Sequence, residues 1–446
     1  CGDAQRALAD ESWPKDVDLR VRMGVHSGLA TPKDGDYVAL AVHQTERIAD
    51  AAHGGQVLVS AQPAAAVRDV PEVTLRDIGR YRIRDFDRAE PLAQLVVPGT
   101  NHRMLAPRAL PAQGHNLTRP ATSFVGRGAE LTRLREKLEP GALVTVAGPG
   151  GVGKSRLAVE VGIEVAEHWE DGVWRVAVDG LPEAALLSTA VADAVGLDLS
   201  ADDSDDMLLA ALQERRALLI LDGCERHLDA AAGLVSRLLQ TTTRSGVLAT
   251  SQEPLHVPGE TVQRLRPLQT SESTTDTDEA ARSPAVQLFV DRARAADSEF
   301  RLTETNAAAV VEIVRRLDGL PLAEEIVAAR SAAFTPAELL ESIERGTGVL
   351  RSKDASLPDR QRTVHNLLSW SEGLLPEAER VTLRRLAVFA GPFTLAQAQV
   401  AGSGSDAEPE SIPDHVWSLV DHSIVLADPS AGGTRYRMLD LVRRFT

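Results

Sequence analysis

A glycine-rich segment that ends in lysine and serine is the feature that most constrains this chain. It reads Gly148-Pro149-Gly150-Gly151-Val152-Gly153-Lys154-Ser155. The apolar run 142–147 before it is typical of a buried parallel strand, and residues 156–161 after it follow a helical pattern. Backbone N–H groups at such a helix start hold the α and β phosphates of a nucleotide, and the lysine reaches the β and γ phosphates. The pattern predicts a purine-nucleotide site that also includes Arg156, and a chance match is the alternative.

A second apolar run ends in an acid that fits the same site. Residues 215–222 read Arg-Arg-Ala-Leu-Leu-Ile-Leu-Asp. In phosphate-loop proteins an acid at this position holds Mg²⁺ opposite the loop hydroxyl. We therefore predict Ser155 and Asp222 as the metal site, and Lys154 and Asp222 as catalytic residues. The alternative is an ordinary aspartate at a strand end.

The position after this acid is a glycine, where a second acid could activate water. Glu225 is the nearest substitute and is our third catalytic candidate. An exposed loop glutamate is the alternative reading.

Composition narrows the classes of function. The 446 residues suffice for about three domains, and no apolar run approaches the ~20 residues of a membrane span. The net charge of −16 disfavours a sequence-independent grip on nucleic acid or on an anionic membrane. With only Cys1 and Cys224 there is no disulfide framework, so we expect a cytoplasmic protein. Both ends fall inside helical patterns, and we expect a piece of a longer protein.

The order of patterns predicts a multidomain α/β chain. Residues 121–268 alternate strands with helices, which is the signature of a doubly wound parallel sheet. Its expected strands are 143–147, 173–178, 217–221 and 246–250. The other expected segments are 1–98 with alternating strands and helices, linkers at 99–120 and 269–283, a helical segment at 284–350, and a helical segment at 355–446 with short strands at 423–428 and 435–438.

Five motifs occur in an order that identifies a family. They are Phe124-Val125-Gly126-Arg127, the phosphate loop, Leu221-Asp222-Gly223-Cys224-Glu225, Ala249-Thr250-Ser251-Gln252-Glu253-Pro254-Leu255 and Leu317-Asp318-Gly319-Leu320-Pro321-Leu322-Ala323. Residues 119–446 thereby resemble the NB-ARC/STAND signalling ATPases of bacteria, which have an AAA+-like core. The resemblance implies a P-loop nucleotide-binding domain, an ARC-type helical domain and a winged-helix domain that close around ADP and open on exchange for ATP. It also implies self-association on activation, while the sequence does not identify the activating signal.

The resemblance assigns further residues to the nucleotide. Val125, Arg127 and Pro321 match positions that contact the nucleotide in the family. Asp440 matches the acid of the family's Met-His-Asp motif, in which Leu439 here replaces the histidine.

Two further positions depart from the family pattern. Gln252 stands where the family has a sensor arginine, and a neutral amide donates less strongly than a guanidinium. We therefore expect weak nucleotide discrimination and weak hydrolysis, with Gln252 still at the nucleotide. Glu324 stands where the family prefers isoleucine, and we expect a carboxylate there to be exposed or paired.

Residues 1–98 resemble the C-terminal part of a class III adenylyl/guanylyl cyclase domain. The resemblance is carried by Arg-Val-Arg-Met-Gly-Val-His-Ser-Gly at 20–28, Gly-Asp-Tyr-Val-Ala-Leu-Ala-Val-His at 35–43 and Ala-His-Gly-Gly-Gln-Val-Leu-Val-Ser at 52–60. It implies a partial ferredoxin-like fold. In the family, Asp36 aligns with the residue that helps select the purine, His43 takes the place of an asparagine that acts in the transition state, and Arg47 matches its arginine.

Cyclisation needs two Mg²⁺ held by a carboxylate pair, which the family carries upstream of this segment. Asp3 lies too close to the strand at 20–26 to supply one of them, and we interpret it as a solvated helix residue. We do not expect this segment to cyclise a nucleotide.

Three functions remain open. The leading one is a STAND-type ATPase switch in a bacterial regulatory protein, which binds ADP or ATP with Mg²⁺ and hydrolyses ATP slowly. The second is a nucleotide cyclase regulated by the ATPase module. The third is a transcriptional regulator whose DNA-binding domain lies outside this chain, because we expect this acidic segment to contact neither nucleic acid nor membrane.

Overall fold

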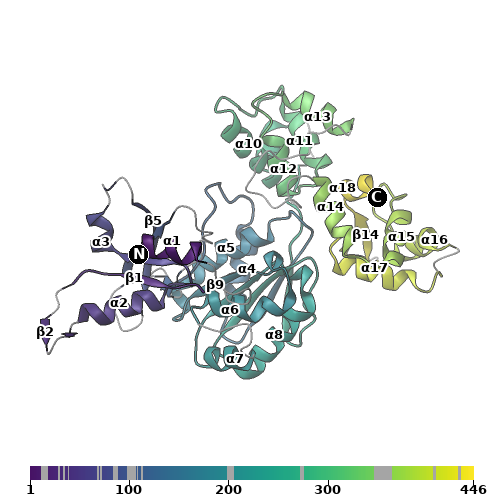
Figure 1. Ribbon diagram of the computed structural model, residues 1–446. Coiled ribbons are helices and arrows are strands. Elements are labelled where there is room, and N and C mark those ends of the chain that lie inside the picture. Colours follow the sequence, from purple (N-terminus) through teal and green to yellow (C-terminus); the bar gives the residue numbers. More distant parts are fainter. Residues whose placement is uncertain are drawn as a thin grey trace. The chain divides into compact units, whose positions relative to one another are not determined.

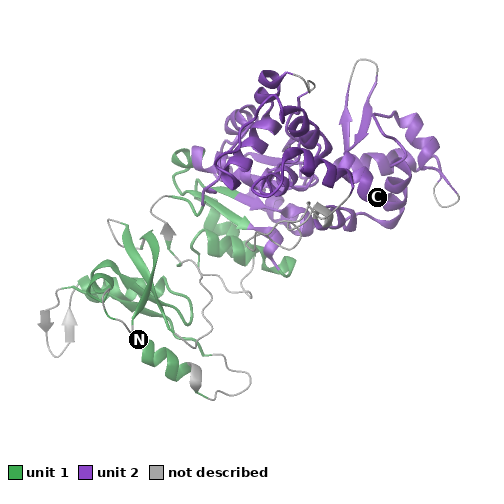
Figure 2. Cartoon of the chain, turned by 90° about the horizontal axis from the view of Figure 1, so that it is seen from above, with its two compact units in different colours: residues 1–117, 165–176, 182–219 green, residues 118–164, 177–181, 220–446 purple. Residues whose placement is uncertain are grey.

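The computed structural model divides the chain into two compact units, shown in Figure 2. Unit 1 comprises residues 1–117, 165–176 and 182–219, and unit 2 comprises residues 118–164, 177–181 and 220–446. The residues that the structure describes are 1–11, 19–28, 31–33, 36–38, 40–67, 70, 73–83, 89–97, 107, 109–111, 114–197, 205–271, 276–345, 364–404, 408–429 and 433–446.

The first part of unit 1 is built on a mixed five-stranded sheet of order β1-β4-β6-β5-β7. β4 runs parallel to β1 and antiparallel to β6, and all four residues of β4 are buried. Ile48, Leu58 and Leu92 form the centre of its core. The elements are α1 (Gly2–Asp10), β1 (Met23–Val25), β2 (Thr31–Lys33), β3 (Asp36–Val38), α2 (Leu40–Asp50), β4 (Val57–Ser60), α3 (Ala61–Ala66), β5 (Thr74–Arg82), β6 (Glu90–Val96) and β7 (Leu110–Pro111).

Two details of this part bear on the sequence predictions. Asp3 lies on α1 with an exposed side chain that pairs with Arg6, as predicted. Strand β7 lies within 99–120, where only a linker was expected, and it pairs antiparallel with β5.

The phosphate loop belongs to a second five-stranded sheet, of order β12-β8-β11-β10-β9. Its strands are β8 (Leu143–Ala147), β9 (Val173–Ala177), β10 (Leu218–Asp222), β11 (Gly246–Ser251) and β12 (Glu260–Arg264). The four predicted strands are therefore confirmed to within one residue at either end, and β12 was not predicted. β8, β10 and β11 are buried along their whole length, which is why they read as continuous apolar runs.

Three strands of this sheet, β8, β11 and β12, are parallel, and their ends are aligned. β8 pairs in parallel with β11 and with β12, so that Ala147 lies beside Ser251 on one side and Arg264 on the other. The carboxyl ends of parallel strands face one edge of a sheet, where open α/β folds bind their ligands. The phosphate loop follows β8 at this edge.

Short helices accompany this sheet along the chain. They are α4 (Gly128–Lys137), α5 (Lys154–Val165), η1 (Ala166–His168), η2 (Val178–Gly180), η3 (Ala184–Leu186), α6 (Leu187–Ala194), α7 (Asp205–Gln213), η4 (Cys224–Arg226) and α8 (Leu228–Thr241).

The rest of unit 2 is mainly helical, in two groups (Figure 1). The first group comprises α9 (Thr277–Arg282), α10 (Pro284–Ala296), α11 (Ala307–Arg316), α12 (Pro321–Ala328) and α13 (Pro336–Glu344). The second, which we call the C-terminal segment, comprises α14 (Val364–Gly373), α15 (Glu377–Leu386), α16 (Leu395–Gly402), α17 (Ile412–Asp421), β13 (Val425–Asp428), β14 (Arg435–Met438) and α18 (Asp440–Phe445). β13 and β14 form an antiparallel pair, which confirms the two predicted terminal strands. Helix α9 lies where the second linker was expected, and its start is capped by Asp276.

Among the residues that the structure describes, none of the helices has both the length and the apolarity that crossing a bilayer requires.

Candidate nucleotide-binding site

The phosphate loop turns sharply between β8 and α5. Gly151 and Gly153 have φ of 75° and 98°, a left-handed conformation that favours glycine. At Gly148 an added Cβ would lie 2.6 Å from the carbonyl oxygen of Leu265, so the loop passes too close to the chain after β12 to accept a side chain. Together with Pro149, Gly150 and Val152, these glycines bring the backbone to the first turn of α5, where N–H groups lack helical partners.

Lys154 bridges the two ends of this loop. Its Nζ donates to the carbonyl oxygens of Gly148, at 2.7 Å, and Pro149, at 3.1 Å, and the side chain is buried. These acceptors hold the ammonium group over the loop, where a phosphate would be cradled. Ser155 follows as the second residue of α5, on the same turn.

Asp222 is buried at the end of β10 and is oriented by Thr250. The Oγ1 of Thr250 donates to Oδ1 of Asp222 at 2.6 Å and accepts from the backbone N–H of Gly223 at 2.9 Å. Thr250 lies near the end of β11, the strand between β8 and β10. The end of β11 also contacts the loop, because the Gly148 N–H donates to the Ser251 carbonyl at 3.3 Å. The three strand ends are thus joined by hydrogen bonds.

Geometry explains why position 223 carries no second acid. Gly223 has φ of 80°, and an added Cβ would lie 2.7 Å from the Cβ of Asp179. A side chain at this position would be strained and would also collide with Asp179.

Glu225 is more enclosed than an ordinary loop glutamate. Its Oε2 is buried and has no hydrogen-bond partner within the described part of the chain. Burial raises the pKa of Glu225; Lys154 and a local backbone N–H oppose this, while Asp222 and Glu253 add to it. The carboxylate therefore lies within the electrostatic reach of the predicted phosphate and metal ligands.

Arg127 supports the phosphate loop from the start of α4. Its guanidinium is buried, donates to the Val152 carbonyl at 3.1 Å, and pairs with Glu130 at 3.1 Å. Burial lowers the pKa of Arg127, an effect that Glu130 and Glu324 oppose. Val125 is half-buried two residues before it. The nucleotide contacts predicted for both residues remain predictions.

Arg156 is directed away from the loop. Its guanidinium donates to Thr122 and lies over the ring of Phe124, 5.9 Å from the ring centroid. Only its backbone shares the loop's helix start, so a nucleotide contact by its side chain also remains a prediction.

Pro321 begins the helix that closes against the phosphate loop. It is the first residue of α12, and the next N–H, of Leu322, donates to the carbonyl of Gly151 at 3.1 Å. The preceding Gly319 has φ of 66° and passes the backbone of Leu268, where an added Cβ would lie 2.2 Å from a carbonyl oxygen.

The expectation for Glu324 was wrong. Its side chain is fully buried (0% exposed), and neither carboxylate oxygen has a hydrogen-bond partner among the residues that the structure describes. Burial raises its pKa well above the ordinary value; the neighbouring Glu325 adds to this and Arg127 opposes it. The group avoids the cost of an unpaired buried charge by holding its proton.

Gln252 is buried (2% exposed) at the loop that follows β11. The backbone carbonyl oxygen of Gln252 accepts a hydrogen bond from Oγ of Ser423, at 2.7 Å. The next residue, Glu253, pairs with Nδ1 of His422 at 3.2 Å. The sensor position therefore contacts the C-terminal segment, through residues that the sequence did not single out.

Asp440 is the first residue of α18, and its carboxylate pairs with Arg443, at 3.1 Å, on the next turn. The backbone beside it is held by Asp318, whose Oδ2 accepts from the N–H of Leu441 at 2.8 Å. Leu439 is fully buried. The contact of Asp440 with a nucleotide remains a prediction.

The predicted cyclase-like residues lie in unit 1. His43 is exposed on α2 and lies 3.8 Å from Glu46, and Arg47, half-buried one turn later, lies 3.8 Å from Asp50. Asp36 begins β3, and its side chain is outside the described residues.

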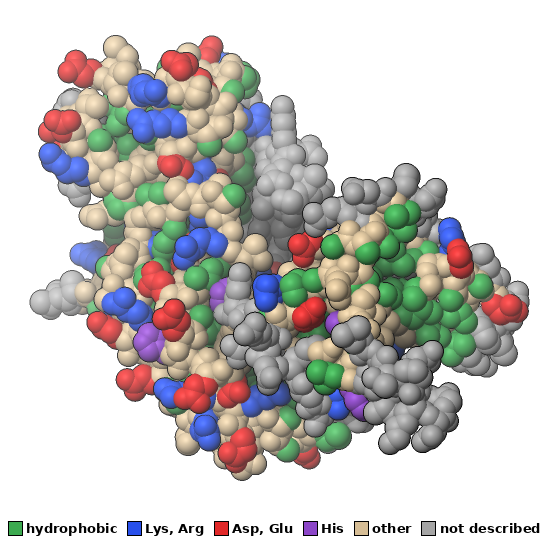
Figure 3. Space-filling model, turned by 90° about the vertical axis from the view of Figure 1, so that its left-hand side faces the viewer, with side chains coloured by type: hydrophobic (Ala, Val, Ile, Leu, Met, Phe, Trp, Pro, Cys, Tyr) green, Lys and Arg blue, Asp and Glu red, His purple; other side chains and the backbone are tan. Residues whose placement is uncertain are grey.

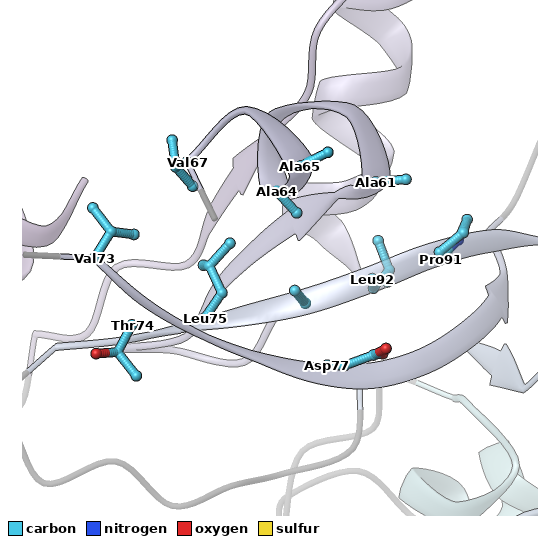
Figure 4. A pocket seen from close by; sticks show the side chains of 11 residues that line it. Ala61, Ala64, Ala65, Val67, Val73, Thr74, Leu75, Asp77, Pro91 and Leu92 are labelled. Atoms are coloured by element: carbon cyan, nitrogen blue, oxygen red, sulfur yellow. The ribbon is translucent and has the colours of Figure 1, made fainter. Parts of the chain in front are cut away.

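A cavity of about 410 Å³ in unit 1 lies between α3 and strands β5 and β6 (Figure 4). Among the described residues, alanine, valine, leucine and proline side chains line most of it, and an acidic side chain, Asp77, accepts from the N–H of Gly79 at 2.8 Å. The lining residues that the structure describes lack the converging polar groups of a catalytic site.

Comparison with known proteins supports the reading of the phosphate-loop segment. Residues 129–254 match the NB-ARC domain family. The chain is 40% identical over 313 residues to a Mycobacterium tuberculosis protein named "Putative HTH-type transcriptional regulator", covering 70% of this chain and 34% of that protein. It is 36% identical over 344 residues to an uncharacterised M. tuberculosis protein, covering 77% of this chain and 84% of that protein. The chain therefore spans about a third of the first relative and most of the second.

A solved structure with partial likeness is a Signal Transduction ATPase with Numerous Domains, with a tetratricopeptide repeat sensor, from Pyrococcus horikoshii. It shares 17% identity and a TM-score of 0.32, over 75% of this chain and 43% of that one.

The parallel sheet, the phosphate loop and the matched domain define a phosphate-loop module of the NB-ARC class. More particularly, the chain belongs to the family of the uncharacterised mycobacterial protein, most of whose length it covers.

The residues present fit Mg²⁺ bound together with a nucleotide. The described residues contain no group of three or more His, Cys, Asp and Glu side chains that could hold a metal alone. Ser155 and Asp222 offer one hydroxyl and one carboxylate, which are hard oxygen donors. Mg²⁺ commonly takes one or two protein ligands and completes its shell with phosphate oxygens and water.

Proposed function

We propose that this chain is the nucleotide-operated switch of a bacterial regulatory protein, which holds ADP at rest, exchanges it for ATP and resets by slow hydrolysis. The observation that carries the proposal is the hydrogen-bonded set of three strand ends, where Lys154 and the Thr250–Asp222 pair face one edge of the sheet. On this proposal, residues 121–268 form the nucleotide-binding domain, residues 284–350 the helical domain and residues 355–446 the winged-helix domain.

In this mechanism the nucleotide phosphates replace the loop carbonyls as acceptors for Lys154. The phosphates then lie at the N–H groups of the loop and of the first turn of α5, which favour negative charge. Ser155 and Asp222 would hold Mg²⁺, which neutralises phosphate charge when bound. Thr250 fixes the orientation of Asp222.

Glu225 is the proposed base for hydrolysis. A carboxylate whose pKa is raised is a stronger base than an ordinary glutamate, so it takes a proton from an attacking water more readily. Gln252 supplies no cation at the γ-phosphate, which supports slow turnover.

Binding of fluorescent ADP to the purified chain, with and without Mg²⁺, tests the proposal. The Lys154→Ala variant should lose at least tenfold in affinity, because each lost contact to phosphate contributes more than 1 kcal/mol. The matched control is Lys137→Ala, which removes the same charge from an exposed position on α4. Equal affinity in Lys154→Ala and the parent would exclude the switch.

A second candidate function is transcriptional regulation. The support is the 40% identity to the mycobacterial relative named as a transcriptional regulator. Most of that relative's length lies outside the region that matches this chain. On this proposal the DNA-binding element is elsewhere in the full protein. On the face seen in Figure 3, acidic and basic side chains are interspersed, and the net charge is −16. A salt-sensitive shift of DNA by this chain would contradict the assignment of DNA binding to another segment.

For residues 1–98 we propose a cyclase-homology domain without cyclase activity of its own. The support is the sequence resemblance, with His43 and Arg47 four residues apart on α2. Incubation with ATP or GTP and Mg²⁺ should give no cyclic nucleotide, and its formation would favour the cyclase alternative instead.

A further inference from the structure

The C-terminal segment is held on the rest of unit 2 by contacts far apart in sequence. At the first of these contacts, which we call the sensor contact, Oγ of Ser423 donates to the backbone carbonyl of Gln252, and His422 pairs with Glu253. At the second, which we call the helix-cap contact, the Asp318 carboxylate accepts from the N–H of Leu441. Each includes a largely buried group that gains or loses a proton.

Fixed charges flank the sensor contact. Arg264 pairs with Asp421 at 2.6 Å and also donates to the Val420 carbonyl at 3.0 Å. Arg266 pairs with Asp428 and donates to the Ala427 carbonyl at 3.0 Å. These pairs join β12 and the chain that follows it to the end of α17 and to β13.

His422 is more stable as a cation in the docked state. Burial lowers the pKa of His422, but the carboxylate of Glu253 raises it, as do Glu379 and Asp421, and the net change is upward. His256, 4.0 Å from Asp421, is a further titratable neighbour. Because the docked pKa is raised, protonation favours docking, and this contribution is lost as pH rises through the docked pKa of His422.

Asp318 is more stable as a neutral acid in the docked state. Its pKa rises from 3.8 to about 6, first because it is buried. The backbone N–H groups of Leu441 and Asp440 and the Arg437 side chain oppose this rise, and the Asp440 carboxylate adds to it. Arg437 lies 3.8 Å away and does not compensate the buried charge. Docking is therefore favoured by acid here too, and the contribution falls between pH 4 and 6.

Protons can reach the helix-cap contact. Asp318, Arg437 and Asp440 line an open cavity of about 1080 Å³, where the chain after β12, helix α9 and the C-terminal segment meet. The same cavity includes Arg266, Arg315 and Asp428.

We propose that His422 and Asp318 form one proton-dependent latch, which holds the C-terminal segment docked at acidic pH and loosens it as the pH rises. The latch goes beyond the nucleotide switch, since its contacts need no nucleotide. Protonation favours docking at both groups, although His422 docks as a cation and Asp318 docks as a neutral acid.

Fluorescence energy transfer in the full chain, without nucleotide, tests the proposal between pH 5 and 8.5. Dyes are attached at Val400→Cys, exposed on α16, and Glu136→Cys, exposed on α4, in a Cys1→Ser background. Cys224 is fully buried, and burial raises its pKa, so it does not compete for the dye. Transfer should be highest at acidic pH and fall as the pH rises.

Two variants separate the arms of the latch. Asp318→Asn keeps an acceptor for the Leu441 N–H but cannot ionise, so at pH 8 its docking equilibrium should rise by on the order of 100-fold over the parent. The difference should narrow to on the order of tenfold at pH 5, because the pKa of Asp318 is about 6 when docked and 3.8 ordinarily. His422→Gln should do the opposite, matching the parent at pH 8.5 and docking less at pH 6.

Controls distinguish a latch from a general effect. Asp297→Asn changes another aspartate that accepts a backbone N–H, from Glu299 in the first helical group. His415→Gln changes a histidine that shares a hydrogen bond with Thr382 inside the C-terminal segment. Both should follow the parent curve, and circular dichroism checks folding. Lys154→Ala should also follow it, so loss of nucleotide binding does not affect the readout. A parent curve that is flat with pH, or an Asp318→Asn curve that equals it, would overturn the proposal.

Discussion

Replacement of Thr250 by valine isolates one interaction at the centre of the site. Thr250 is fully buried, and its hydroxyl is a donor to Asp222 and an acceptor for the N–H of Gly223. Valine has the same shape but removes the hydroxyl. The Gly223 N–H keeps a second acceptor, the Thr250 carbonyl at 3.2 Å, so the main loss falls on the carboxylate.

The magnitude follows from the charge of the acceptor. A hydrogen bond to a buried ionised group contributes about 1.5–3 kcal/mol, so Thr250→Val should lower the free energy of unfolding by about 2 kcal/mol. It should also weaken ADP binding in the presence of Mg²⁺ by about tenfold, because Asp222 loses its orientation. Binding without Mg²⁺ should change little, since Lys154 and the loop are untouched.

Urea denaturation measures the first effect and fluorescent ADP titration the second. Thr145→Val is the matched control, because Thr145 is equally buried on neighbouring β8 but its hydroxyl has no hydrogen-bond partner in the described residues. That control should be neutral or slightly stabilising, and Thr250→Ser should retain binding. If Thr250→Val and Thr145→Val behaved alike in both assays, the role given to Thr250 would be wrong.

Two further substitutions test buried acids near the site. Glu324→Leu should stabilise the chain by on the order of 2 kcal/mol at pH 8.5 and by less at pH 5. The reason is that the raised pKa of Glu324 makes its contribution to the free energy of unfolding fall as the pH rises. Thermal melts at both pH values measure the gain, and a larger gain at pH 5 would contradict this reasoning. Glu225→Gln should reduce ATP hydrolysis by about 100-fold while ADP affinity stays within a few-fold, measured by phosphate release and by titration; unchanged turnover would remove Glu225 as the base.

The sheet around the phosphate loop could be predicted because burial and pattern agree there. β8, β10 and β11 are buried along their length, a glycine-rich turn follows β8, and an acid ends β10. β12 escaped prediction because it lies at the edge of the sheet, and its residues Glu-Thr-Val-Gln-Arg are only partly buried. Helix α9 was hidden by the polar composition of its surroundings.

The site was predictable where the chemistry is local and not where it depends on long-range contacts. The loop, Lys154 and Asp222 follow from short motifs. Thr250 belongs to a recognised motif, but its bond to Asp222 spans 28 residues, and those of His422 and Asp318 span far more. Glu324 was misread because its burial depends on how α12 packs against the loop and Arg127, which no local pattern records.

The nucleotide that accompanies the purified chain tests the central claim most directly. The nucleotide is released from the protein by denaturation and resolved by ion-exchange chromatography. The parent chain should yield close to one equivalent of ADP, which should be absent from Lys154→Ala and retained in Lys137→Ala. A parent chain that carries no nucleotide and binds neither ADP nor ATP on titration would contradict the account.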